Sequence, residues 1–129
     1  MRGILKALTV LGALVTVTTA AAAPVKTFMS KPFAGVKANT GTVTATVDMG
    51  KITLKVSDDF VIPDTPAPSW QIVDSKGNTY LLNQFRIKGD KTNREITLPG
   101  YIKDVAKVQV WCSFAEVLLG ETSFDSVVK

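Results

Sequence analysis

Histidine is absent from all 129 residues of the chain. Histidine is a common ligand of zinc and copper, the usual general base near neutral pH, and a member of the common catalytic triads. The chain also contains no glycine-rich phosphate loop and no nucleophile elbow. We therefore expect no metal site and no stand-alone enzyme of these classes, and no pattern of residues indicates a particular cofactor.

The chain has only one long apolar run, Leu8 to Val17 near the N-terminus, and it is interrupted by Thr9, Gly12 and Thr16. It is shorter than the roughly 20 residues that span a bilayer. Basic residues precede it and alanines follow it, which is typical of a cleavable export signal. We expect residues 1–22 to be a signal peptide removed before Ala23, leaving a periplasmic or secreted protein with no membrane span.

Clusters of basic residues are missing as well. Without Arg2 and Lys6, the 15 basic residues fall to 13 against 11 acidic residues, a net charge of about +2. These residues are spread singly along the chain, whereas a surface that follows a phosphate backbone concentrates them. Nucleic acid is therefore not an expected partner, and the oligomeric state has no signature in the sequence.

Alternating apolar and polar residues dominate the rest of the chain. The runs 42–49 and 51–56 alternate around Gly50 and predict a hairpin. Three prolines between residues 57 and 69 predict a loop outside any central strand, with Phe60 and Ile62 as apolar anchors. Further runs predict hairpins of 70–73 with 79–82 and of 84–88 with 95–98, then strands over 107–114 and 115–120 and a tail from Thr122.

These runs predict an antiparallel β-sandwich or closed barrel of about seven to nine short strands. We place one domain at about residues 30–124, after a lead-in anchored by Phe33, and a tail at 125–129.

The run Lys107 to Phe114 holds the only cysteine, Cys112. Strand alternation puts Val108, Val110, Cys112 and Phe114 on one face, and Lys107, Gln109, Trp111 and Ser113 on the other. An unpaired cysteine in an exported protein is a candidate reactive or intermolecular thiol. Free cysteine is also often buried as a small apolar residue, in surroundings that raise the thiol pKa and suppress its reactivity. Strand alternation points the Cys112 sulfur inward, but the residues alone leave both interpretations open.

Two other groups of residues allow a functional and a structural interpretation. Trp111, Trp70 and Tyr80 can line a ligand surface or pack across strands. Asp58 and Asp59 beside Asp64 can offer oxygen ligands to a hard cation, but they lack the spacing of a calcium loop and suit a solvated turn.

Three segments resemble the DM-thirteen domain, a small extracytoplasmic module. The first pairs Phe33-Ala34-Gly35 with Gly41-Thr42-Val43. The second runs from Leu54 to Phe60 and continues with Thr65-Pro66-Ala67-Pro68. The third and most specific is Val108-Gln109-Val110-Trp111-Cys112 with Leu119-Gly120.

The resemblance implies an all-β module with a role in redox chemistry or electron transfer, in which the cysteine of the family falls on Cys112. It makes Trp111, Lys37, Asp59 and Pro68 candidate binding residues. Lys37 stands where many members have histidine, and Ala67-Pro68-Ser69 stands where a glycine-proline-aspartate loop is usual. A cofactor or metal bound through that histidine and aspartate would lack those ligands here.

Two functions therefore compete. In the first, Cys112 is the redox group of an exported module that meets a redox partner protein. In the second, the chain is a non-catalytic module whose loops bind another envelope protein or a small ligand, or serve a structural role.

Overall fold

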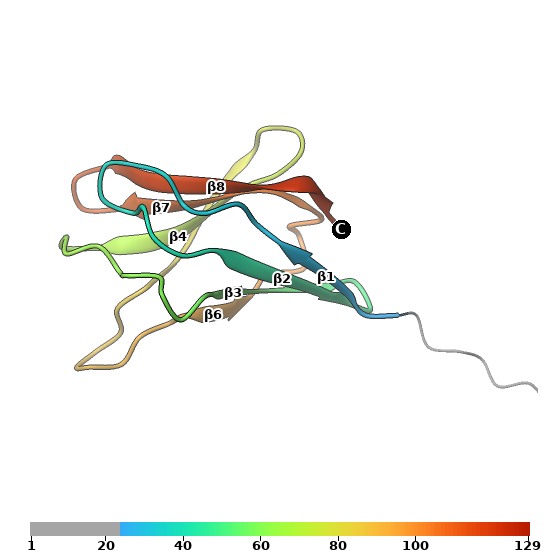
Figure 1. Ribbon diagram of the computed structural model, residues 1–129, viewed down its shortest axis with the longest axis horizontal. Coiled ribbons are helices and arrows are strands. Elements are labelled where there is room, and N and C mark those ends of the chain that lie inside the picture. The colour runs from blue at the N-terminus through green and yellow to red at the C-terminus, as the bar shows by residue number, and fades with distance from the viewer. Residues whose placement is uncertain (1–23) are drawn as a thin grey trace, which may run out of the picture.

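The computed structural model describes residues 24–129, and the expected signal peptide, residues 1–22, lies outside them. The described chain forms two four-stranded antiparallel sheets that face each other as a sandwich (Figure 1). This confirms the predicted antiparallel all-β fold, and of the two predicted architectures the chain forms the sandwich and not the closed barrel. The strands are β1 (Lys26–Met29), β2 (Val43–Asp48), β3 (Lys51–Val56), β4 (Pro68–Val73), β5 (Thr79–Gln84), β6 (Glu95–Thr97), β7 (Val105–Cys112) and β8 (Val117–Val128).

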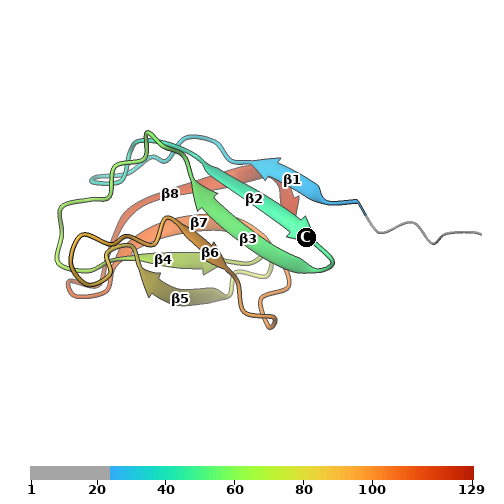
Figure 2. The same cartoon turned by 90° about the horizontal axis from the view of Figure 1, so that it is seen from below.

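One sheet has the strand order β1-β2-β3-β6 and the other has the order β5-β4-β7-β8. The two layers are seen edge-on in Figure 1, and Figure 2 shows the first sheet from its outer side. No helix in residues 24–129 has the length and apolarity to span a membrane.

The predicted β2–β3 hairpin is present, and its residues show why it forms. Alternate side chains of the two strands, such as Ala45 and its partner Leu54, are fully buried. Met49 and Gly50 connect the strands with φ angles of 51° and 81°. Positive φ at both turn residues matches the twist of a two-residue hairpin.

Aromatic rings fill the sandwich beneath the loops. The rings of Phe33 and Phe60 lie 5.0 Å apart, Phe60 and Phe85 lie 5.3 Å apart, and Phe85 stacks on Trp70 at 4.6 Å. All four side chains are buried. The predicted anchors Phe33 and Phe60 therefore join the main core, and Ile62 packs partly buried against it.

The prediction of a loop up to Ser69 was wrong at its end, because β4 begins at Pro68 and is a central strand. Proline is tolerated as the first residue of a strand because only its missing N–H is lost from the ladder. The Pro68 carbonyl still accepts a hydrogen bond from the Phe85 N–H at 2.8 Å.

The predicted hairpin of 84–88 with 95–98 was also wrong. Residues 85–94 cross from one sheet to the other, and β6 pairs with β3, where Ile96 lies opposite Leu54. The aromatic core explains the crossing, because Phe85 leaves the sheet to pack between Trp70 and Phe60. Local alternation predicts a strand but does not identify its partner.

The prediction that Phe114 shares one face with Val108, Val110 and Cys112 was wrong. Those three side chains are buried, whereas Phe114 is 77% exposed. Strand β7 ends at Cys112, and the turn 113–116 reverses the chain with Glu116 at φ 56°. Beyond the turn, β8 runs through Val128, so residues 122–128 form strand where the sequence predicted a tail.

Candidate functional site

Cys112 is the last residue of β7, at the end of the sandwich opposite the C-terminus (Figure 1). It lies across from Pro68 of β4 and Val117 of β8. Its side chain is 1% exposed, so the inward orientation predicted by strand alternation is confirmed. The sulfur lies at one end of the core, beneath the turn 113–116.

The turn 113–116 places a hydrogen-bond donor on the sulfur. The Ala115 N–H donates to Cys112 Sγ at 3.4 Å, and the Glu116 N–H donates to the Cys112 carbonyl at 2.7 Å. Cys112 therefore holds the start of the turn through both its side chain and its backbone. This is a structural role that strand alternation alone did not predict.

The surroundings of the thiol are polar as well as buried. The Ala115 N–H is the largest influence and lowers the pKa of Cys112 below its ordinary value. Burial acts in the opposite direction, and the backbone of Ala67 and Phe114 and the Thr65 hydroxyl lower the pKa further. Donors that favour the thiolate therefore outweigh desolvation, in contrast to a thiol enclosed only by apolar side chains.

A short network of hydrogen bonds closes the loop 57–67 over this site. The Ser113 N–H donates to the Ala67 carbonyl at 3.0 Å, and the Ser69 hydroxyl reaches the same carbonyl at 3.1 Å. The hydroxyls of Ser69 and Ser113 lie 3.2 Å apart. Access to the sulfur from this side requires these contacts to open.

The structure brings together only some of the residues predicted for the site. Pro68 is fully buried and directly opposite Cys112. Trp111 is half-buried on the outer face of the same sheet, so it neighbours the thiol in sequence but faces away from it.

Lys37 and Asp59 lie apart from the thiol in exposed segments. The Lys37 N–H donates to the Leu119 carbonyl at 2.9 Å, and its ammonium group has no ion pair within residues 24–129. Asp59 accepts a hydrogen bond from the Ser57 hydroxyl at 2.5 Å. Neither side chain is among the groups that shift the pKa of Cys112.

Thr65 and Ala115 belong to the site, but the sequence assigned a role to neither. Ala115 follows Cys112 by three residues, which is the spacing at which a turn brings a backbone N–H back onto a side chain. Thr65 is 47 positions from Cys112, and only the packing of the loop against the end of β7 brings them together.

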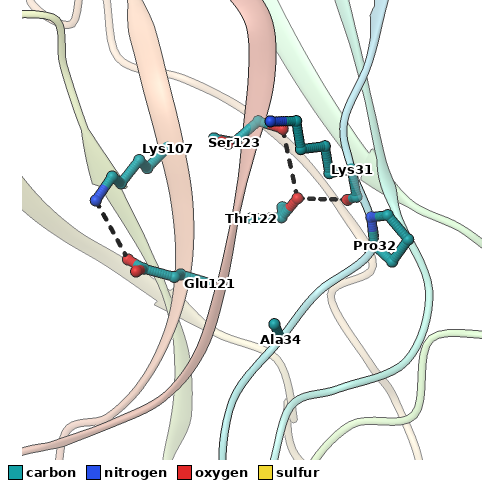
Figure 3. A pocket seen from close by; sticks show the side chains of 7 residues that line it. All are labelled: Lys31, Pro32, Ala34, Lys107, Glu121, Thr122 and Ser123. Atoms are coloured by element: carbon teal, nitrogen blue, oxygen red, sulfur yellow. Dashed lines mark hydrogen bonds and ion pairs between the residues drawn. The ribbon is translucent and has the colours of Figure 1, made fainter.

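A separate open pocket of about 280 Å³ lies beside β8, and Figure 3 shows its lining. It is lined by Lys31, Pro32, Ala34, Lys107, Glu121, Thr122 and Ser123. Lys107 Nζ lies 3.9 Å from Glu121 Oε1, which also accepts a hydrogen bond from Gln109 Nε2 at 2.9 Å. The one carboxylate of this pocket is therefore already paired.

Within the described residues, no three cysteine, aspartate or glutamate side chains are grouped where they could hold a metal ion. Asp58, Asp59 and Asp64 are all exposed to solvent.

No protein-family model, curated protein or solved structure matches the chain. The resemblance to the DM-thirteen domain therefore stays a prediction.

Proposed function

We propose that the protein is an exported thiol redox module, in which Cys112 exchanges disulfides with a partner. The observation that carries the proposal is the hydrogen bond from the Ala115 N–H to a buried sulfur. The Ala115 N–H and its neighbours favour the thiolate, which is the form that attacks a disulfide. A residue that serves packing alone needs no such donors.

The chemistry balances with a disulfide as the co-reactant. The Cys112 thiol first releases its proton to solvent. Its thiolate then attacks one sulfur of the partner disulfide, the partner's sulfur–sulfur bond breaks, and a mixed disulfide with Cys112 forms while the other sulfur leaves as a thiolate. A lone cysteine holds this mixed disulfide until a second thiol resolves it.

Because the sulfur is 1% exposed, this reaction requires a local opening of the turn 113–116 or of the loop that closes over it. Local openings of a turn occur far more often than global unfolding when few contacts break. The opening must release the contact between Ser113 and Ala67, which is one backbone hydrogen bond supported by two serine hydroxyls.

The test is the rate at which Cys112 reacts with an aromatic disulfide reagent under native conditions, measured against denaturant concentration. We expect a rate that exceeds the one allowed by global unfolding and that changes little at low denaturant. The control is Val110→Cys in a Cys112→Ser background, because Val110 is buried on the same face of β7. The proposal is wrong if both thiols react only through global unfolding.

A second function, a non-catalytic binding module, is favoured by apolar side chains on the loops. Val36, Val61 and Phe114 are 78%, 63% and 77% exposed. They belong to three loops at the end of the sandwich away from the C-terminus (Figure 1). Large exposed apolar side chains on neighbouring loops are common where a protein binds a partner.

The two functions predict different effects of Cys112→Ser on the capture of an envelope protein by this protein. In the binding function, the variant retains the partner, while Phe114→Ser loses it. Met49→Ser is the matched control, because Met49 is 86% exposed on the β2–β3 turn at the other end of the sandwich. Capture that depends on Cys112 and not on Phe114 contradicts the binding function and favours the redox module.

A further inference from the structure

An open pocket of about 210 Å³ lies between the turn of the β4–β5 hairpin and the segment that leads into β7. Residues between 74 and 80 line one side, and Tyr101, Lys103 and Asp104 line the other. Asp104 directly precedes β7, whereas Cys112 is the last residue of this strand. The pocket and the thiol therefore lie at opposite ends of β7, and a function of the pocket is independent of the thiol.

The Asp74 carboxylate fixes the shape of the pocket. Its Oδ1 accepts hydrogen bonds from the N–H groups of Lys76 at 2.9 Å and Asn78 at 2.8 Å. Its Oδ2 accepts hydrogen bonds from Asn78 Nδ2 at 3.0 Å and from the Tyr80 hydroxyl at 2.9 Å. A carboxylate offers about four acceptor positions, so those of Asp74 are all used. Asp74 is therefore part of the frame of the pocket and is not a ligand-binding group.

The Asp104 carboxylate differs from Asp74 because it retains acceptor capacity. Its two oxygens accept hydrogen bonds from the Ser75 N–H at 2.8 Å and the Ser75 hydroxyl at 2.7 Å, which tie the two sides of the pocket together. About two of its four acceptor positions stay open. The ammonium groups of Lys76 and Lys103 supply donors, and neither forms an ion pair in residues 24–129. The pocket therefore combines open acceptors and open donors on a fixed frame.

Tyr101 adds an aromatic surface to these polar groups. Its side chain is 65% exposed, and its ring lies 5.9 Å from the ring of Tyr80, which packs partly buried against the core. The next residue, Ile102, is buried and donates its N–H to the Pro99 carbonyl at 3.0 Å, so the backbone at Tyr101 is held in place. Packing explains Tyr80, but it leaves most of the Tyr101 ring facing solvent at the pocket.

The charges of the pocket favour a neutral ligand. Asp74 and Asp104 balance Lys76 and Lys103, so the lining has no net charge with which to attract an anion or a cation. A neutral sugar ring has a face of C–H groups that can stack on an aromatic ring, and its hydroxyls both donate and accept hydrogen bonds. These properties match an exposed tyrosine beside a carboxylate and an ammonium group.

We propose that this pocket binds one ring of a neutral saccharide, which stacks on Tyr101 and forms hydrogen bonds through its hydroxyls to Asp104 and Lys103. Pockets that enclose a whole drug-sized ligand measure about 300–1,000 Å³, so a smaller pocket of about 210 Å³ suits a single ring. The neighbouring units of an oligosaccharide extend into solvent. This binding site goes beyond both functions proposed above.

The experiment titrates the isotope-labelled protein with neutral cello-, malto-, manno-, galacto- and chito-oligosaccharides and follows the backbone amide signals by NMR. We expect at least one of these sugars to shift the amide signals of Ser75, Asn78 and Lys103. The same titration in high salt should give the same affinity, because a neutral ligand has no charge to be screened. Oligogalacturonate, which is anionic, is the contrasting probe and should not bind more tightly than the neutral sugars.

Variants then test the contacts. Tyr101→Ala should weaken the binding about tenfold, whereas Tyr101→Phe keeps the ring and should retain it. Lys103→Ala keeps the ring but removes a donor, and it should weaken the binding about fivefold. Phe114→Ala is the matched control, because Phe114 is an exposed aromatic residue at the other end of β7 and its removal should change nothing.

Three results would overturn the inference. The first is that none of the neutral sugars shifts the amide signals of the pocket. The second is that a neutral sugar binds as tightly to Tyr101→Ala as to the wild type. The third is that only oligogalacturonate binds and that high salt abolishes its binding, since this would identify a site for anions.

Discussion

Gly35 and Gly120 are packed so closely that a Cβ atom on Gly35 would lie 2.3 Å from the Cα of Gly120. This contact seats the segment 30–38 against β8. The Ala34 N–H donates to the Glu121 carbonyl at 3.0 Å, and the Glu121 N–H donates back at 2.9 Å. The segment thereby covers the edge of β8, which would otherwise present unpaired backbone groups to other chains.

Gly120→Ala is expected to destabilise the protein by at least about 2 kcal/mol, because overpacking forces the backbone to shift. The added Cβ would lie 2.1 Å from the Ala38 carbonyl oxygen, which is part of the backbone and cannot rotate away. Urea denaturation would show a lower midpoint. Gly100→Ala is the control, since its Cβ would meet nothing within 4 Å, and a similar loss in both variants would contradict the steric explanation.

Asp74 is expected to make the stability of the β4–β5 hairpin depend on pH in the acid range. Hydrogen bonds lower the pKa of Asp74 to about 2, against the opposing effect of burial. The Asn78 side chain makes the largest contribution, followed by the Asn78 N–H, the Tyr80 hydroxyl and the Lys76 N–H. The unfolded value is about 3.9, so the carboxylate stabilises the fold above that pH and loses its effect as pH falls toward 2.

The measurement is the melting temperature against pH for wild type and Asp74→Asn. The difference between them should be constant above about pH 5 and should shrink between about pH 4 and pH 2. Asp90→Asn is the control, because it removes an exposed carboxylate from another part of the chain. A difference that does not change with pH would argue against this role of Asp74.

Trp70→Phe is expected to destabilise the protein by about 2–3 kcal/mol through lost ring volume and a lost hydrogen bond. Trp70 is fully buried, and its Nε1–H donates to the Asn93 carbonyl at 2.8 Å. Trp111→Phe should change stability by less than about 1 kcal/mol, because the ring is half-buried on the outer face. Chemical denaturation of both variants checks the contrast, and an equal loss would mean that Trp111 also supports the fold.

Arg94→Lys is expected to destabilise the protein by about 1–2 kcal/mol, since a lysine ammonium lacks the planar fork of donors. Arg94 Nη2 donates to the Ser57 carbonyl at 2.7 Å and to the Phe60 carbonyl at 2.9 Å. Arg86→Lys is the matched control, because exposed Arg86 makes two longer contacts of 3.3 Å to loop carbonyls. Equal unfolding midpoints for the two variants would contradict a special role for Arg94.

Much of the fold follows from local patterns in the sequence. The β2–β3 hairpin, the hairpin of β4 with β5 and the inward sulfur of Cys112 were all predicted, because strand alternation depends only on neighbouring residues. The predictions from the sequence were wrong where a segment of the chain leaves the strand or sheet that its neighbours belong to. Alternation does not show that Phe85 leaves its sheet, or that Phe114 lies in a turn and points to solvent.

The candidate site could be predicted only through Cys112 itself. The sequence shows that Cys112 is the only cysteine and that it lies in a strand. Pro68 was also predicted as a site residue, and it lies opposite Cys112. Lys37 and Asp59 were predicted but lie in other segments. No local signal indicates Thr65, because it reaches Cys112 only after the loop folds onto β7.

The amino-acid order alone establishes that this chain forms strands, which side chains of most strands face inward, and which chemistries lack residues to perform them. These are properties of residue types and of a spacing of two. The tertiary structure decided the pairing of β6 with β3, the cover of β8 by residues 30–38, and the donors around the sulfur. The physical reason is that such contacts join residues far apart in the chain, so they depend on how the whole core packs.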